Sequence, residues 1–196
     1  MPEVPYDELR WEVVLSAAGQ FAEQPAGHGR VLSGVAVDFP TAPGGPDVIG
    51  PTPTPDAAGP TPTPDTAGPT PDAAVLAPDL VVLARGAVRG ERGRFGAAGV
   101  EAVLEVARPD LAEAGRAYAS SGVPLYVVVD PAAAVCTVHT APSPEGVYRE
   151  AERVPFGNDL FLSLGGRTVV LRTDPFPTPS PTPGADRGVG RGIVDG

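Results

Sequence analysis

The sequence predicts a mixed α/β domain in which a mixed β-sheet is flanked by helices. Short runs rich in Val and Leu, typical of buried strands, recur between residues 77 and 172. One helical pattern precedes these runs and another crosses between two of them, as in layered α/β folds. Two proline-rich tracts contain few large apolar residues, so we expect them to stay outside the core.

The first elements are a helix over residues 6–23 and a strand over residues 30–39. In the helix, Leu9, Val13 and Ala17 fall on one stripe, and Asp7 and Glu8 suit the positive end of the helix dipole. In the segment 30–39, apolar and polar residues alternate with the period of a strand.

The remaining elements follow a β-β-α-β order with further strands. The strands are expected at residues 77–84, 100–107, 125–129, 135–140, 147–154 and 167–172, with a polar, glycine-rich loop at 85–99. A helix is expected at residues 110–121, where Asp110 and Glu113 have the spacing of a capping box and Gly122 ends the helix.

Between the first strand and the second lies a threefold repeat, GPTPTPDAA, GPTPTPDTA and GPTPDAA, at residues 50–74. Proline at every second position removes backbone donors and fixes φ, which excludes both helix and sheet ladders. We therefore divide the chain into an N-terminal helix and strand (1–39), a disordered Pro/Thr insert (40–75), a core (76–172) and a disordered tail (173–196).

Composition narrows the classes of function. All 14 basic residues are arginines, the net charge is −10, and there is one cysteine, Cys136. A disulfide within the chain and a Cys/His zinc site are thereby excluded. The chain as a whole is acidic and lacks the excess of basic residues that is usual in nucleic-acid binders. No apolar run approaches the length of a membrane span, and the N-terminus lacks a signal pattern, so we expect a cytoplasmic protein without membrane contact.

Two carboxylates, Asp79 and Glu105, lie in or at the end of apolar strands joined by one loop. Two such strands could bring the carboxylates together into an oxygen-rich site of the kind that Mg²⁺ or Mn²⁺ occupies. A metal there could activate water for phosphodiester hydrolysis. The alternative is that Asp79 caps a turn after Pro78 and that Glu105 points to solvent.

An ordered series of short motifs covers about half of the chain, from Val75 to Arg172. It comprises Pro78-Asp79-Leu80, Glu105-Val106, Tyr118-Ala119, Gly122-Val123-Pro124 and Val129-Asp130. In this order the motifs resemble the Uma-type family of restriction endonucleases, in the PD-(D/E)xK nuclease superfamily.

The resemblance implies a restriction-endonuclease-like core, DNA as the substrate, and pairing into homodimers. Asp79 and Glu105 would then be catalytic and bind Mg²⁺ or Mn²⁺. The chain lacks the lysine of these nucleases, because the superfamily position is Ala107 and the alternative helical position is Ala114. Arg108 is the candidate that could assist catalysis, although it could also be a surface partner of Asp110.

The missing lysine leaves two hypotheses open: a metal-dependent endonuclease, or a catalytically inactive nuclease fold kept as a binding or assembly module. The loop arginines 85, 89, 92 and 94 could bind phosphate or simply be solvated. His139 is expected to be a half-exposed strand residue, and Tyr118, Tyr126, Phe156 and Phe161 are expected to belong to the core rather than to a binding surface.

Overall fold

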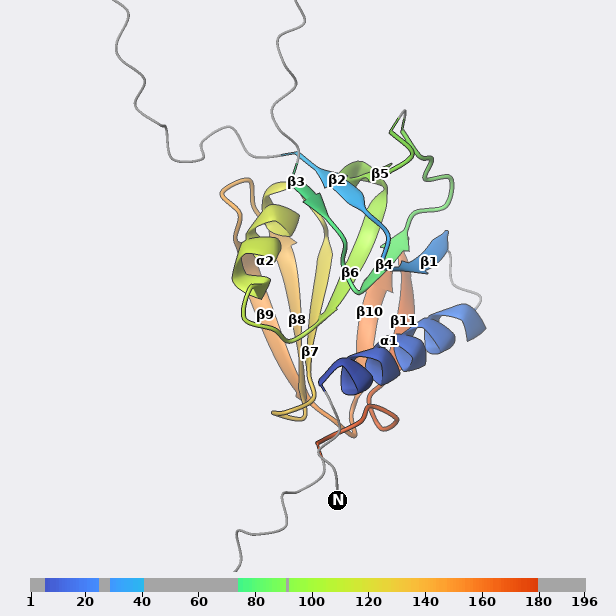
Figure 1. Ribbon diagram of the computed structural model, residues 1–196, viewed down its shortest axis with the longest axis vertical. Helices are drawn as coiled ribbons and strands as arrows, with labels where there is room; N and C mark the ends of the chain where they lie inside the picture. Colours follow the sequence, from blue (N-terminus) through green and yellow to red (C-terminus); the bar gives the residue numbers. More distant parts are fainter. Residues whose placement is uncertain (1–5, 25–28, 41–73, 91, 180–196) are drawn as a thin grey trace, which may run out of the picture.

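The computed structural model describes residues 6–24, 29–40, 74–90 and 92–179. Most of the expected insert, residues 41–73, and residues 180–196 of the expected tail lie outside the described residues. Within the described part, a six-stranded sheet lies between two layers of helices and small sheets (Figure 1). The mixed α/β class predicted from the sequence is confirmed.

The central sheet has the strand order β1-β4-β6-β7-β8-β9. Its central pair, β6 and β7, is parallel, and all other neighbours in this sheet are antiparallel. The parallel pair requires a crossover, which α2 supplies. The bounds are β1 Arg30–Ser33, β4 Leu80–Leu83, β6 Val100–Val106, β7 Leu125–Asp130, β8 Val135–Pro142 and β9 Tyr148–Pro155.

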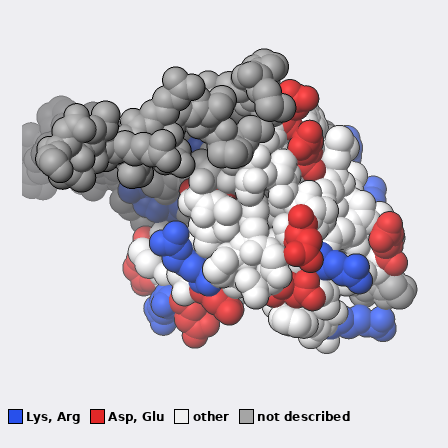
Figure 2. Space-filling view, turned by 90° about the horizontal axis from the view of Figure 1, so that it is seen from below, with Lys and Arg blue, Asp and Glu red and all other residues white. Residues whose placement is uncertain are grey.

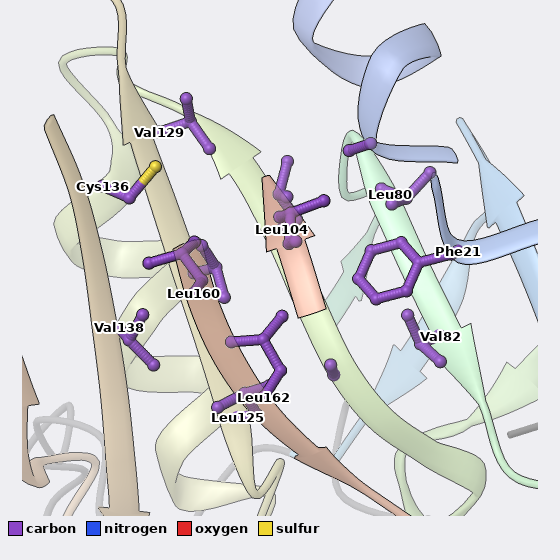
Figure 3. Packing of buried hydrophobic residues seen from close by; sticks show 14 of the residues in the cluster. Phe21, Leu80, Val82, Leu104, Leu125, Val129, Cys136, Val138, Leu160 and Leu162 are labelled. Atoms are coloured by element: carbon purple, nitrogen blue, oxygen red, sulfur yellow. The ribbon is translucent and has the colours of Figure 1, made fainter. Parts of the chain in front are cut away.

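One face of this sheet is covered by α1 (Tyr6–Glu23) and by a hairpin of β10 (Asp159–Leu164) and β11 (Arg167–Arg172). Figure 3 shows how Phe21 of α1 and Leu160 and Leu162 of β10 pack against the side chains of the sheet. Fully burying a side chain such as Phe21 stabilises the fold by about 1.5–3 kcal/mol, so this layer is a main source of stability.

The opposite face is covered by α2 (Leu111–Ser120) and by a small sheet of order β3-β2-β5. Its strands are β2 Val37–Phe39, β3 Ala74–Leu76 and β5 Phe95–Gly96, and the short 3₁₀ helix Ala97–Gly99 leads into β6. The buried rings of Phe39 and Tyr118 meet edge to face, with centroids 4.9 Å apart. They join the small sheet to α2 over the central strands.

The segment 30–39, expected to be one strand, forms two strands in different sheets. Gly34, with φ at +60°, turns the chain between β1 and β2. A residue with a side chain adopts this backbone conformation at a cost, whereas glycine adopts it freely. The alternation of apolar residues was therefore real, but the glycine within it ends one strand.

The second strand of the core is shorter than expected, because β4 covers only Leu80–Leu83 and leaves Ala77, Pro78 and Asp79 before it. The sequence interpretation also missed β10, although the buried Leu160, Leu162 and Leu164 alternate with exposed residues along it. Phe161 is one of these exposed residues, so its expected place in the core is wrong: it points to the face of the strand that the sheet does not cover. The ordered chain continues past residue 172, because Thr173 is buried and Phe176 packs edge to face on Phe156.

The predicted capping box of α2 is wrong. Asp110 occupies the N-cap position, but its carboxylate makes no side-chain hydrogen bond to the helix. The carboxylate accepts a hydrogen bond from Arg108 Nε at 2.8 Å instead. The predicted end of the helix is confirmed, since Gly122 follows it with φ at +75° and its N–H bonds the Ala119 carbonyl.

Neither described helix combines the length and apolar character needed to cross a membrane.

Candidate active site

Asp79 and Glu105 lie at the same end of two neighbouring strands. Leu80 faces Leu104 in the antiparallel register of β4 and β6, so one further step along each strand brings residues 79 and 105 beside each other. Asp79 is only 4% exposed and Glu105 is completely buried. Burying two carboxylates is costly unless polar partners surround them, so their contacts decide what this site can do.

The carboxylate of Asp79 is held from two sides. Its Oδ1 accepts hydrogen bonds from Arg10 of α1, through Nε at 2.7 Å and also through Nη2. Its Oδ2 accepts a hydrogen bond from the backbone N–H of Val106, at 2.8 Å. Asp79 therefore ties the first helix to the last residues of β6.

Glu105 points from β6 towards α2. Its Oε1 accepts a hydrogen bond of 2.5 Å from the hydroxyl of Tyr118. Its Oε2 lies 2.9 Å from Arg108 Nη1, but among the described residues this oxygen has no partner with hydrogen-bond geometry. Arg108 and Glu105 therefore form an ion pair in which no guanidinium N–H points at the carboxylate oxygen.

Burial raises the pKa of Glu105 to about 7, although the Tyr118 hydrogen bond and the charge of Arg108 both lower it. The neighbouring charge of Asp79 adds to the increase. Burial likewise raises the pKa of Tyr118, and the carboxylate of Glu105 adds to that increase, so Tyr118 stays protonated and can donate its hydrogen bond. Near neutral pH, the site is poised between a protonated and an ionised Glu105.

Arg108 combines the two interpretations that the sequence left open. Its Nη1 lies against Glu105, while its Nε donates a 2.8 Å hydrogen bond to the exposed Asp110. Its side chain is about a quarter exposed, at 25%. Arg108 is therefore a partner of Asp110 and at the same time places a positive charge beside Glu105.

The interpretation of Glu105 as a solvent-facing residue is wrong, because its side chain is buried under α2. Ala114, one of the two positions where related nucleases carry a lysine, is also buried, on the face of α2 that carries Tyr118. Residues four apart share a face of a helix, so position 114 lies one turn before the tyrosine that contacts Glu105. A methyl group there supplies no charge.

The chemistry of these oxygens is compatible with a divalent cation. Glu105 Oε2 is buried and has Arg108 beside it in an ion pair without hydrogen-bond geometry, so this oxygen could also accept a metal cation. Within residues 6–24, 29–40, 74–90 and 92–179, no group of three or more His, Cys, Asp or Glu side chains gathers as metal ligands. A metal here would rely on two carboxylates, with water and substrate oxygens completing its shell, which is common for Mg²⁺.

The loop arginines do not reach this site. The segment 85–99, expected to be a loop but containing β5 and the 3₁₀ helix, joins the far end of β4 to the start of β6, opposite the end that carries Asp79 and Glu105. Arg94 pairs with Asp38 at 2.9 Å, and Arg30 and Arg89 lie over the ring of Phe95 at 5.5 and 5.2 Å. These cations are held mainly by the protein itself.

The surface seen from below the view of Figure 1 carries both signs of charge around an uncharged centre (Figure 2). On the described part of this face, arginines and acidic residues are interspersed and form no continuous basic surface. Any attraction for a polyanion on this face would therefore be local, consistent with the net charge of −10.

Two residues of the site escaped the sequence interpretation. Arg10 is 69 positions from Asp79, and no local spacing signals that they meet. Tyr118 was correctly assigned to the core, yet its hydroxyl also donates to Glu105. For Tyr118 a signal existed, because a buried phenol usually finds a hydrogen-bond partner.

Comparisons with known proteins identify a family and several similar solved structures. The crystal structure of a "putative nuclease" from Anabaena variabilis matches with a TM-score of 0.45 and 16% identity, over 83% of this chain and 73% of that one. No functionally curated protein matches the chain significantly. The sequence model of the Uma2 family, described as "Putative restriction endonuclease", matches residues 54–172. That range is more than half of the 196 residues, and the chain therefore belongs to the Uma2 family of nuclease-like proteins.

Proposed function

We propose that this protein is a metal-dependent endonuclease that hydrolyses phosphodiester bonds in DNA at the Asp79–Glu105 site. The observation that carries the proposal is the pair of buried carboxylates on adjacent strand ends, one of them with an oxygen that lacks a hydrogen-bond donor among the described residues. Membership of the Uma2 family supports the reaction class.

Asp79 and Glu105 would hold the metal, Mg²⁺ or Mn²⁺. When bound, such an ion polarises a phosphoryl oxygen and lowers the pKa of a bound water. Glu105 would contribute Oε2, which Arg108 contacts only as an ion pair, and Asp79 would contribute Oδ1 once the guanidinium of Arg10 moves away. The hydrogen bond from Tyr118 fixes the other oxygen of Glu105 and so orients the carboxylate.

Arg108 assists by binding rather than by moving a proton. Its guanidinium lies 2.9 Å from Glu105 and a quarter of the side chain is exposed, so it can reach a phosphate at the same place. A guanidinium stabilises negative charge but stays protonated at ordinary pH, which makes it a poor substitute for a lysine that exchanges protons. Arg108 would therefore neutralise charge on the phosphate during cleavage.

The proposal extends to the setting of the reaction. DNA is the substrate and the active form is a homodimer, as the family resemblance implies, and the cytoplasm is the proposed compartment. Molecular mass in solution, measured by light scattering, tests the dimer independently of activity.

A second candidate function is a catalytically inactive nuclease fold that serves as a binding or assembly module. The observation that favours it is that each carboxylate already has a cationic partner, Arg10 for Asp79 and Arg108 for Glu105. Internal ion pairs of this kind can satisfy the buried charges without metal. The absence of lysine from the sequence agrees with this candidate.

Cleavage of plasmid and single-stranded DNA in Mn²⁺ separates the two candidates. The pure protein is compared with the double variant Asp79→Ala/Glu105→Ala, and with Glu152→Ala as a control that removes an exposed carboxylate from β9. The endonuclease proposal expects cleavage by the protein and the control, and a loss of about a hundredfold or more in the double variant. No cleavage by the unmodified protein would favour the inactive module.

A further inference from the structure

A hollow in the protein surface, with a volume of about 360 Å³, lies beside the candidate active site. It is formed by the first turns of α2, by β7 and β8, and by the loop that leads into β9. We call it the aromatic pocket, and the residues that line it include Leu111, Ala112, Tyr126, Val128, His139 and Tyr148. Its volume is near the lower end for ligand pockets, which suits one small ring system rather than a duplex.

The aromatic pocket lies one strand away from Glu105. In the parallel register of β6 and β7, Glu105 is paired with Val128, which lines the pocket. Neighbouring strands are about 4.8 Å apart, and paired residues point to the same face of a sheet. A nucleotide with its phosphate at Glu105 could therefore extend its base into this pocket.

Three rings from three strands make up one wall of the pocket. Tyr126 and His139 are register partners on β7 and β8, with centroids 5.4 Å apart and planes 22° from parallel. Tyr148 lies 5.8 Å from each of them and is tilted by 30° from Tyr126. Tyr126 itself is buried, so the half-buried rings of His139 and Tyr148 supply the surface on which a nucleobase of any kind can stack.

One residue that lines the pocket carries an unsatisfied polar group. Tyr126 is 4% exposed, and its hydroxyl is buried without a hydrogen-bond partner among the described residues. Burial raises the pKa of this phenol, and the charge of Glu105 adds to the increase, so the hydroxyl keeps its proton. Burying a hydroxyl without a partner is unfavourable, and because this hydroxyl is covered by protein, a ligand pairs with it only after the surrounding side chains shift.

We propose that the aromatic pocket receives a single unstacked nucleobase of the DNA strand that is cut at Asp79 and Glu105. This inference rests on the proposed endonuclease function and adds the kind of substrate. A base reaches such a pocket easily from single-stranded or locally melted DNA, whereas intact duplex must first lose stacking and pairing at a cost of a few kcal/mol. The enzyme therefore prefers unpaired substrate.

The test measures the contribution of a base without requiring cleavage. Isothermal titration in Mg²⁺ compares deoxyadenosine 5′-monophosphate with 2-deoxyribose 5-phosphate, which carries the same phosphate and sugar but no base. The protein should bind the nucleotide about tenfold or more tightly, since stacking on aromatic side chains is worth about 1–3 kcal/mol per base.

The variant Ala112→Leu fills the pocket from an exposed position on α2, and Ala22→Leu makes the same change at an exposed position on α1. Both positions tolerate leucine in a helix, and thermal unfolding confirms that each variant is folded. Ala112→Leu should abolish the preference for the nucleotide and leave sugar phosphate binding unchanged, whereas Ala22→Leu should keep the preference. His139→Ala removes one of the rings that line the pocket and should reduce the preference for the nucleotide.

Equal binding of the two probes by the unmodified protein, including no binding of either, overturns the inference. A preference that survives in Ala112→Leu overturns it as well. If DNA cleavage depends on Asp79 and Glu105 but the two probes bind equally, the proposal of a base-binding pocket is refuted and the endonuclease proposal is kept. If the protein binds the nucleotide more tightly but cuts no DNA, the proposal of a base-binding pocket is kept and the endonuclease proposal is refuted.

Discussion

Each carboxylate of the candidate site is compensated by a different element, and this determines how single residues respond to change. Asp79 depends on Arg10 from α1, whose side chain is 37% exposed, while Glu105 depends on Tyr118 and Arg108. Removing one partner of a buried pair leaves a charge that is neither hydrated nor balanced. A bound cation could replace the missing partner.

Replacing Arg10 by methionine tests this compensation. We expect Arg10→Met to lower the free energy of unfolding by about 1–2 kcal/mol in EDTA, less than for a fully buried pair because Arg10 is partly exposed. Mn²⁺ should then stabilise the variant more than it stabilises the unmodified protein, because the ion no longer competes with the guanidinium. Urea unfolding with and without Mn²⁺ measures both effects.

Arg153→Met on the exposed strand β9 is the matched control and should change neither quantity. An Arg10→Met variant as stable as the parent, with no added response to Mn²⁺, would contradict the role assigned to this ion pair.

The pH dependence of stability follows from Glu105. Its pKa is about 7 in the folded protein, against an ordinary value of 4.5, so between these values the folded state holds a proton that the unfolded state has lost. The free energy of unfolding therefore decreases as pH rises from about 4.5 through 7, by an amount on the order of 3 kcal/mol. Glu105→Gln keeps an acceptor for Tyr118 but cannot ionise.

The check is the difference in unfolding free energy between the two proteins, measured in EDTA from pH 4.5 to 8. Glu105→Gln should gain stability relative to the parent as pH rises. A difference that stays constant over this interval would show that Glu105 titrates normally.

At the scale of elements, the sequence predicted those with a strong local period and missed those that depend on the rest of the fold. The helix at 6–23 matches its predicted bounds, and Gly122 ends α2 as expected. The segment 30–39 was divided by Gly34, and β10 was overlooked despite its alternation. In both places the sheet that a strand joins depends on the strands it pairs with, and these lie far away in the sequence.

The role of Gly34 can be measured against a glycine in a helix. Gly34→Ala should destabilise the protein by roughly 1–2 kcal/mol, because φ at +60° is unfavourable for a residue with a Cβ although no atom crowds the position. Gly19→Ala, in α1 and equally uncrowded, should stabilise it by about 0.5–1 kcal/mol. If both substitutions shifted the urea midpoint in the same direction, the proposed turn would be refuted.

The overlooked strand β10 contains two consecutive residues, one buried and one exposed. Leu162 is 1% exposed, whereas Phe161 is 72% exposed. Leu162→Ala should therefore cost about 2–5 kcal/mol, and Phe161→Ala should stay within about 0.5 kcal/mol of the parent. Similar losses for the two variants in urea unfolding would show that the hairpin does not pack on the sheet as described.

At the scale of the whole molecule, the site is assembled from parts that the sequence keeps far apart. The motifs around Asp79 and Glu105 were enough to identify the family, and the family match from residue 54 confirms that resemblance. The match does not include α1, yet α1 supplies the cation that holds Asp79. Sequence reasoning found the two carboxylates because each interrupts an apolar strand, and it missed Arg10 because contact across 69 residues leaves no local pattern.

The central claim is that Asp79 and Glu105 share a divalent cation, and titration with Mn²⁺ at pH 8 tests it most directly. Glu105 is ionised at this pH, since its pKa is about 7. The account predicts one Mn²⁺ per chain, bound about tenfold or more weakly by Asp79→Asn and by Glu105→Gln, and unchanged in the control Glu152→Gln. No Mn²⁺ binding by the unmodified protein, or equal binding by all four proteins, would contradict the account and leave the two carboxylates as structural partners of Arg10 and Arg108.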